Sequence, residues 1–298
     1  MLFFQTLIFN TQKQFHMRKF LFAIPVIAIL ILVVISCKKS VTSDVEPVTT
    51  ALSQEERALV AAAGFDGGWA EKTADGNYLI EGDILLSQSA LQSMAGVTPS
   101  HEYVMGNEEH YRTTNLVNTG GGVRNITVSL GSGFPAYYSN GLDLALAHYN
   151  SLNLNIHFTR VASGGEINIA GANLGRTIGG GCVLGQSAGF PDASGNPAAG
   201  FTLSTSKCAT SYISTAAKAD EVMAHEIGHC IGFRHTDYMN RISCGSNSNE
   251  GTAGVGAIHI DGTVFTPTSG NYNSWMMACV NGDNSFSSED NFALQSVY

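Results

Sequence analysis

Apolar and polar residues alternate with a period of two in several short segments of this chain. Such alternation is typical of strands with one buried and one exposed face. Other short runs are mostly apolar and lie between turn-forming residues, which also favours strands. The strands expected from these patterns are 78–86, 123–130, 152–161, 166–170, 179–189 and 201–206.

Helical spacing of apolar residues appears in separate parts of the chain. Ser53 and Glu56 have the spacing of a capping box, which predicts a helix over 54–63 that stops at Gly64. The other expected helices are 140–151, 216–231 and a final helix that begins after Ser287 and ends at Tyr298. Strands interspersed with a few helices, followed by a loop-rich tail, predict an α+β fold.

The N-terminus has the features of an export signal. Residues 20–35 form an apolar run that follows Arg18 and Lys19 and precedes Ser36 and Cys37. The run is shorter than the roughly 20 residues that span a bilayer. Residues 34–37 resemble a bacterial lipobox, and the following lysines resemble lipoproteins of the Bacteroidota. This resemblance implies lipidation at Cys37 and an extracytoplasmic place in the cell envelope, at the outer membrane or cell surface, held by the lipid alone. A plain secretory signal and an uncleaved anchor are the alternatives.

Charge and composition argue against nucleic-acid binding and against a disordered chain. The chain has 15 Lys+Arg against 24 Asp+Glu, a net charge of -9, and an acidic protein is a poor candidate for nucleic-acid binding. Hydrophobic residues make up 44% and charged residues 13%, which argues against wholesale disorder. We expect a monomer.

The cysteines indicate disulfides, because the chain is expected to leave the cytoplasm. The six cysteines include Cys37, so five remain, and at least one of these is unpaired. Spacing alone does not assign the pairs. We expect one disulfide across the short loop that joins two of these cysteines, a second disulfide earlier in the chain, and a buried free thiol. The expected assignments are Cys230–Cys244, Cys182–Cys208 and free Cys279.

The strongest chemical signal lies in the expected helix 216–231. His225 and His229 are four residues apart, so both imidazoles lie on one helix face, where they can bind one metal ion. Glu226 lies beside them, where it can act as general base toward a metal-activated water. Gly232 can end the helix in a left-handed conformation, which lets His235 return as a third ligand. Three histidines leave an open position, as in catalytic zinc sites.

This string resembles the metzincin signature H-E-x-x-H-x-x-G-x-x-H. Metzincins also have a Met-turn beneath the metal, and residues 274–278 (S-W-M-M-A) resemble it. The register favours Met276, with Met277 as the alternative. The resemblance implies a zinc endopeptidase, acting on protein or peptide substrates with one catalytic zinc ion.

The longer text M-A-H-E-I-G-H-C-I-G-F-R-H-T-D resembles a bacterial family of dual-action HIV-1 matrix metalloproteases. The resemblance implies a metzincin-like zincin fold: a twisted mixed sheet over the metal-binding helix, a Met-turn and a C-terminal helix. Its antiparallel edge strand would bind extended substrate, and we expect that strand at 182–188. Thr236 matches neither the Ser of matrixins nor the Asp of adamalysins. Asp237 is expected either to orient a histidine or to hold the following loop.

Residues 80–84 (I-E-G-D-I) resemble the F-x-G-D motif of astacin pro-segments. In that motif an Asp carboxylate takes the position meant for water, which would make Asp83 a latency ligand. The alternative is that Asp83 ends an ordinary turn. No cysteine lies between 38 and 181, so a cysteine switch is excluded.

The expected organisation follows from these features. It comprises a signal peptide (1–37), a tether (38–52), an N-terminal pro-like segment (53–118) and a catalytic domain (119–298). Two other functions are compatible with the same residues: a catalytically inactive surface-binding lipoprotein, and a zinc amidase acting on non-peptide or cell-wall amides.

Overall fold

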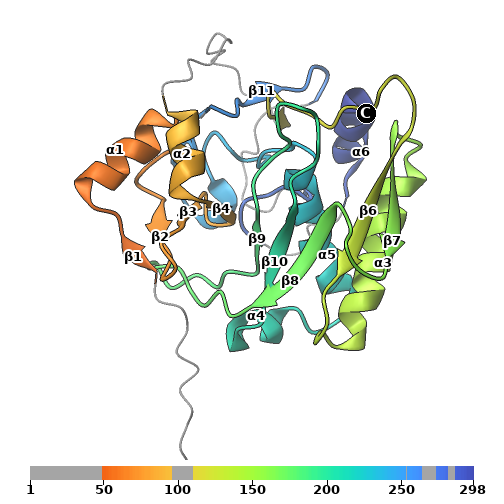
Figure 1. Cartoon of the computed structure of the whole chain (residues 1–298), viewed down its shortest axis with the longest axis horizontal. Helices are drawn as coiled ribbons and strands as arrows, with labels where there is room; N and C mark the ends of the chain where they lie inside the picture. The colour runs from red at the N-terminus through yellow and green to blue at the C-terminus, as the bar shows by residue number, and fades with distance from the viewer. Residues whose placement is uncertain (1–48, 96–109, 253, 264–272, 281–285) are drawn as a thin grey trace, which may run out of the picture. The chain divides into compact units, whose positions relative to one another are not determined.

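The computed structural model describes residues 49–95, 110–252, 254–263, 273–280 and 286–298. Within these residues the fold is built on a nine-stranded sheet with the order β1-β2-β3-β4-β9-β10-β8-β6-β7 (Figure 1). The strands of this sheet are β1 (Thr50–Ala51), β2 (Glu71–Lys72), β3 (Tyr78–Ile80), β4 (Ile84–Leu86), β6 (Arg124–Leu130), β7 (Ile156–Val161), β8 (Ile167–Ala172), β9 (Gly185–Ser187) and β10 (Gly200–Ser204).

The sheet is mixed. Strands β10, β8, β6 and β7 run parallel to one another, whereas β9 is antiparallel to β10. β1 to β4 form an antiparallel meander, and β4 joins β9 in a parallel pairing of Ile84 with Ser187. The predicted α+β fold with a mixed sheet is therefore confirmed. A separate small ladder pairs β5 (Tyr111–Arg112) with β11 (Ile258–His259).

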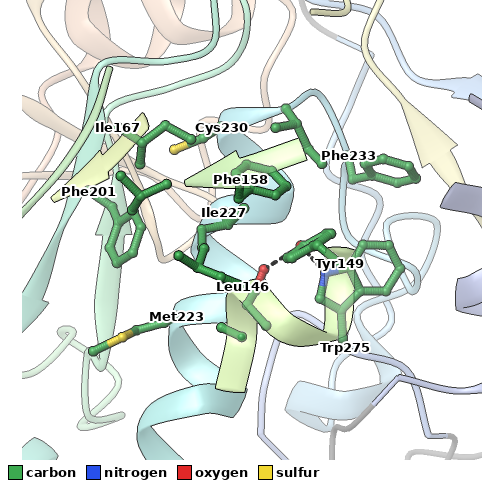
Figure 2. Close-up of a cluster of buried hydrophobic side chains, with 14 of the residues drawn as sticks. Leu146, Tyr149, Phe158, Ile167, Phe201, Met223, Ile227, Cys230, Phe233 and Trp275 are labelled. Carbon is green, nitrogen blue, oxygen red and sulfur yellow. Dashed lines mark hydrogen bonds between the residues drawn. The ribbon is translucent and has the colours of Figure 1, made fainter. Parts of the chain in front are cut away.

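Two long helices pack against each other and against the sheet (Figure 1). They are α3 (Ala136–Ser151) and α5 (Ala216–Cys230). Gly141 lies at their crossing, where an added Cβ would be 2.5 Å from the Cβ of Ala219, so the backbones approach closely. The Tyr149 hydroxyl donates to the carbonyl of Ala224 at 2.7 Å and accepts from Nε1 of Trp275 at 2.9 Å (Figure 2). These buried bonds fix α5, the helix that carries the histidine motif.

A second apolar cluster belongs to the N-terminal segment. Its helices are α1 (Gln54–Ala62) and α2 (Gln88–Met94), and its buried side chains include Val60, Phe65 and Leu91. The capping box of Ser53 and Glu56 is present as predicted. This segment has its own core and also extends the main sheet through β4.

The strand expected over 78–86 is wrong, because the chain folds there into a hairpin. Ile80 pairs with Ile84 across the turn, so β3 and β4 are its two arms. Glu81 and Gly82 have positive φ values of 56° and 93°, a conformation that ends a strand.

The strand expected at 182–188 does not lie at an edge of the sheet. β9 is antiparallel as predicted, but β4 covers its outer side, so it is not an edge.

The expected disulfide pairs are half correct. Cys182 and Cys208 are joined as predicted, but Cys244 pairs with Cys279 and the free thiol is Cys230. Cys230 is fully buried, and its sulfur lies 3.6 Å from the carbonyl oxygen of Gly200. Its position in the helix core therefore holds the thiol away from Cys244.

Short helices complete the fold. They are α4 (Lys207–Tyr212), the 3₁₀-helix η1 (Ile242–Cys244) and α6 (Ser288–Val297). Among the described residues no helix has both the length and the apolar character needed to cross a membrane. The expected signal peptide, the expected tether up to residue 48 and Cys37 lie outside the described residues.

Candidate metal centre

Helix α5 places two of the three candidate histidine ligands. It begins at the N-cap Thr215, whose side chain accepts the Lys218 amide, and it ends at Cys230. His225 and His229 lie one turn apart in its last half, and their Nε2 atoms are 3.1 Å apart. The helix therefore holds both imidazoles toward one point.

Gly232 turns the chain back toward that point. Its φ is +105°, and the helix ends with the Phe233 amide bonded to the carbonyl of Gly228 at 2.9 Å. A left-handed residue here is the usual way to end a helix and reverse its direction. The turn brings His235 beside the two helical histidines, with ring centroids 5.4 Å from His225 and 4.9 Å from His229.

A fourth candidate ligand atom comes from the N-terminal segment. Oδ2 of Asp83 lies 3.2 Å from Nε2 of His225, 3.6 Å from Nε2 of His229 and 2.8 Å from Nε2 of His235. The four ligand atoms all lie within 4.8 Å of one another. Zinc ligands about 2.0–2.1 Å from a tetrahedral ion are separated by about 3.3 Å, which this cluster matches.

The hydrogen bonds of the imidazoles show that the cluster fits a cation. Nδ1 of His225 faces the carbonyl of Trp275 at 2.8 Å, and Nδ1 of His229 faces the carbonyl of Phe233 at 2.9 Å. Nδ1 of His235 faces the Glu250 carboxylate at 2.7 Å. An acceptor at each Nδ1 favours a proton there, which leaves Nε2 of a neutral imidazole to bind a metal. Burial opposes the charge of His235, but Asp83 and Glu250 outweigh it and raise the pKa of His235 well above its usual value, so a metal ion here takes the place of a proton on Nε2.

Burial favours the neutral, metal-binding form of His229. His229 is fully buried, and burial lowers its pKa to about 4. A neutral imidazole at physiological pH keeps its lone pair for a metal.

Glu226 lies at the wall of the cleft beside the histidines. Burial raises its pKa well above the usual value, and the charge of Asp83 adds to the rise. Its Oε2 is buried and has no hydrogen-bond partner among the described residues. Gly185 of β9 makes room for the carboxylate, since an added Cβ there would lie 2.2 Å from Oε1 of Glu226. Glu226 therefore has a raised pKa and an oxygen without a hydrogen-bond partner among the described residues.

A cleft with a volume of about 570 Å³ borders the cluster. Its lining includes Asp83, His225, Glu226, Arg241 and Met277. The hairpin tip therefore forms part of its wall, and β4, which follows the tip, pairs with β9. The arrangement places a candidate metal site beside a cleft that borders the sheet.

The loop expected to be the Met-turn packs beneath the histidines. Met276 is fully buried, and an added Cβ at Gly228 would lie 2.4 Å from its sulfur. Its carbonyl accepts from the Thr236 amide at 2.7 Å. Asp290, in the first turn of α6, accepts from the Ser274 hydroxyl at 2.6 Å. The loop is thereby tied to residues on both sides of the candidate metal site.

Asp237 has the second of its two expected roles. Its Oδ2 accepts from both the amide and the hydroxyl of Ser243, at 2.9 and 2.6 Å. Its Oδ1 accepts from the Ala278 amide at 2.9 Å. Asp237 therefore holds the loop after the third histidine and joins it to the loop of Met276.

Comparison with known families supports a metallopeptidase. Residues 78–298 match the profile of a family described as "Dual-action HEIGH metallo-peptidase". The chain belongs to this family. It is a metallopeptidase, and the family implies a metal.

Two solved structures are similar to this chain. One, titled "Crystal structure of myroilysin", is 15% identical, with a TM-score of 0.34, and the match covers 61% of this chain and 93% of that one. The other, titled "Structure of Myroilysin", is 18% identical, with a TM-score of 0.35 and coverage of 62% and 82%. No curated protein matches the chain.

The histidines, Glu226, Met276 and Asp83 were all singled out in the sequence, and the structure brings them together. The sequence did not predict the contact of Glu250 with His235 or the space that Gly185 leaves for Glu226. It also assigned no role to Arg234 and Arg241. Glu250 lies in a stretch rich in Gly, Asn and Ser without any period, and no sequence signal connects it to His235.

Proposed function

We propose that the protein is a zinc-dependent endopeptidase that hydrolyses peptide bonds in protein or peptide substrates. His225, His229 and His235 hold the metal, and Glu226 is the general base. The convergence of three Nε2 atoms at one point, beside a cleft that His225 and the buried carboxylate of Glu226 line, carries this proposal.

Each group has a distinct part in the reaction. When bound, zinc supplies Lewis-acid chemistry that polarises the substrate carbonyl and acidifies a water. Glu226 takes the proton of the attacking water at its free Oε2 and delivers it to the leaving amine. Its raised pKa suits both steps, because the carboxylate binds the proton firmly enough to carry it between them. Met276 serves as an apolar floor beneath the histidines.

We also propose that the unprocessed chain is latent. The tip of the β3–β4 hairpin inserts Asp83 among the three histidines, where a carboxylate oxygen is a good zinc ligand. The same hairpin lies along β9, where an extended substrate would pair. Substrate therefore has access only after the hairpin moves or is cut away.

Casein cleavage by the full-length chain tests both proposals. We expect little activity from the wild type and more from Asp83→Ala, with loss of activity in a chelator and recovery on adding zinc. Asp75→Ala removes a carboxylate from the neighbouring turn of the same segment and is the matched control; it should stay latent.

Adding Glu226→Ala to the Asp83→Ala protein should retain zinc and lower the cleavage rate about 10²–10⁴-fold. Full activity in that double variant would remove Glu226 from the mechanism. A zinc-loaded Asp83→Ala protein that cleaves nothing would contradict the peptidase proposal.

We propose that lipidation at Cys37 anchors the protein in the cell envelope. The apolar run and the lipobox-like residues before Cys37 support this proposal. Cys37→Ser should release the protein from the membrane fraction, and intact-mass analysis of the wild type should show a lipid on residue 37. An unmodified Cys37 would contradict the proposal.

A further inference from the structure

A pair of buried arginines lies beside the candidate metal site. Arg234 is 1% exposed and directly precedes His235, and Arg241 is 3% exposed and follows that histidine in the next loop. Arg241 lines the cleft. Its guanidinium lies 3.6 Å from the position of an added Cβ on Gly82, at the tip of the inserted hairpin. The arginines therefore border the space that the hairpin tip fills.

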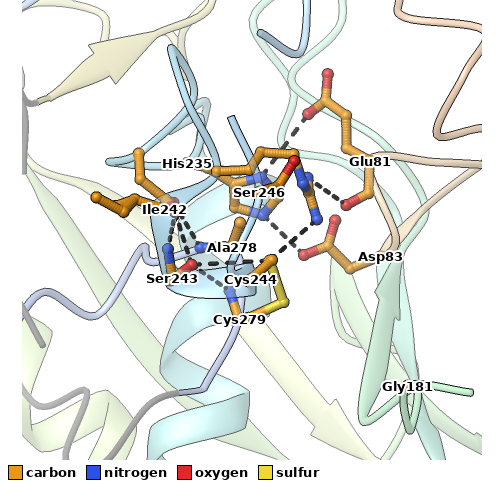
Figure 3. Close-up of a disulfide and its surroundings, with 12 residues drawn as sticks. Glu81, Asp83, Gly181, His235, Ile242, Ser243, Cys244, Ser246, Ala278 and Cys279 are labelled. Atoms are coloured by element: carbon orange, nitrogen blue, oxygen red, sulfur yellow. Dashed lines mark hydrogen bonds and ion pairs between the residues drawn. A yellow bond between two sulfur atoms is a disulfide. The ribbon is translucent and has the colours of Figure 1, made fainter. Parts of the chain in front are cut away.

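The tip presents two acidic side chains rather than one (Figure 3). Asp83 faces the histidines, while the Glu81 carboxylate is paired with Nη2 of Arg234. The Glu81 carbonyl accepts from Nη1 of Arg241 at 2.8 Å. Glu81 is 3% exposed and has a positive φ, so the tip adopts a strained conformation while its side chain is in this buried place.

Outside the hairpin, Glu250 is the carboxylate that pairs with the arginines. It pairs with Arg241, and its second oxygen is 3.8 Å from Arg234. Glu250 also accepts a hydrogen bond from Nδ1 of His235. The charge of Asp237 acts on Arg241 as well, but the oxygens of Asp237 are bonded to Ser243 and Ala278. Without Glu81, Glu250 would be left to pair with both guanidinium groups. A buried cation without a partner is costly, so departure of the hairpin leaves a position that favours an anion.

The arginines also have unused donors. Nε of Arg234 and Nε of Arg241 are buried without a hydrogen-bond partner among the described residues. Arg234 is held in place by the carbonyl of Gly256 at 3.0 Å and by the ring of Tyr238, whose centroid is 5.0 Å from its Cζ. An arginine binds a carboxylate best through two parallel bonds. The fixed guanidinium of Arg234 can therefore hold a carboxylate more completely than the strained tip allows.

We propose that Arg234 and Arg241 form a carboxylate-binding subsite of the peptidase, which Glu81 fills in the closed protein and a substrate carboxylate fills in the open one. This inference rests on the proposed function for its occupant, a peptide in the cleft. The carboxylate comes either from an acidic side chain or from the C-terminus of the substrate, and the two sources are distinguished below.

Chemical rescue tests the subsite without requiring catalysis. Glu81→Ala in the full-length chain removes the carboxylate, and propionate restores its chemistry. We expect the melting temperature of Glu81→Ala to fall, and propionate to raise it by about 2–4 °C. Propionamide, of the same shape but uncharged, should have no such effect, nor should propionate on the wild type or on Asp75→Ala.

If propionate does not raise the melting temperature of Glu81→Ala more than propionamide does, the proposed carboxylate subsite is wrong. If Glu81→Ala folds only in propionate, that result supports the subsite. Glu81→Gln, which keeps the shape of the side chain and removes its charge, then replaces Glu81→Ala in the peptide experiment.

Peptide binding tests the substrate assignment. The protein is the zinc-loaded full chain with Asp83→Ala, Glu226→Ala and Glu81→Ala, and the probes are octapeptides with glutamate placed at each position in turn. The same protein with Glu81 intact is the matched control.

We expect about tenfold tighter binding of glutamate than glutamine at one position, in amidated peptides, and no such preference while Glu81 is present. A preference for free over amidated C-termini instead would assign the subsite to the terminal carboxylate. Equal affinity for every pair would overturn the substrate assignment. Failure of casein cleavage, by contrast, counts against the peptidase proposal and leaves these binding results intact.

Discussion

Glu250 provides the most specific prediction about the metal site. The side chain is buried, and its Oε1 lies 2.7 Å from Nδ1 of His235. It is also paired with Arg241, and Oε2 is 3.8 Å from Nη2 of Arg234. Burial opposes the charge of Glu250, but His235 and Arg241 outweigh it and lower its pKa to about 2. One carboxylate therefore orients a candidate ligand and neutralises a buried cation.

Two variants of Glu250 distinguish its contact with His235 from its charge pairing with the arginines. Loss of the group that orients a metal-binding histidine typically costs 10–100-fold in metal affinity. Loss of one partner of a buried ion pair costs about 3–5 kcal/mol of stability. Glu250→Gln keeps an oxygen that can accept from His235, so we expect the zinc affinity to fall about tenfold. Glu250→Ala removes both contacts, so we expect a fall of about 100-fold.

Zinc affinity is measured by competition with a chromophoric chelator, and stability by urea unfolding of the zinc-free protein. Both Glu250 variants should lose several kcal/mol of unfolding free energy, because both leave the arginines without their charge partner. Glu55→Gln, on the exposed side of α1, is the matched control and should change neither quantity. A Glu250→Ala protein that binds zinc as tightly as the wild type would refute the assigned role.

Three further predictions follow from the same geometry. Gly185→Ala places a Cβ 2.2 Å from Oε1 of Glu226 and should lower cleavage by the Asp83→Ala protein about 100-fold with zinc retained. Gly179→Ala, whose Cβ would lie 3.8 Å from Oγ1 of Thr177, should not lower it. Unchanged cleavage in the Gly185 variant would show that Glu226 needs no such space. Gly232→Ala places a Cβ 2.9 Å from Oγ1 of Thr113 at a residue whose φ is +105°. We expect it to weaken zinc binding and to cost about 1–3 kcal/mol of stability. Gly133 has a similar φ in open space, so Gly133→Ala should cost less, and equal losses of stability would contradict the crowding at Gly232. Burial raises the pKa of the Cys230 thiol to about 12, so iodoacetamide at pH 8 should label Cys230 only after denaturation. The other four cysteines beyond residue 38 form disulfides and should be labelled only after reduction. Labelling of Cys230 in the native protein would contradict its buried position.

The parts of the site that sequence predicts are those that local geometry determines. A spacing of four residues places His225 and His229 on one face of any helix, and a glycine at 232 allows the reversal that returns His235. The Ser53 capping box and the α5 helix are local in the same sense. Each depends on residues a few positions apart.

The remaining features depend on contacts between distant segments. The hairpin at 78–86 follows from positive φ at Glu81, which a mostly apolar run does not reveal. The pairing of Cys244 with Cys279 depends on how Asp237 joins their two loops through Ser243 and Ala278. Two contacts join segments whose sequences show no related motif or spacing. They are the contact of Glu250 with His235 and that of Glu81 with Arg234, and residue spacing therefore could not predict them.

The central claim is that three imidazoles hold one metal ion, with Asp83 as the fourth ligand of the closed protein. X-ray absorption at the zinc edge of the purified full-length chain tests it most directly. We expect one zinc per chain, with three nitrogen ligands and one oxygen ligand at about 2.0–2.1 Å, and a changed oxygen contribution in Asp83→Ala. A sulfur ligand, fewer than three imidazoles, or a protein that binds no zinc would contradict the account.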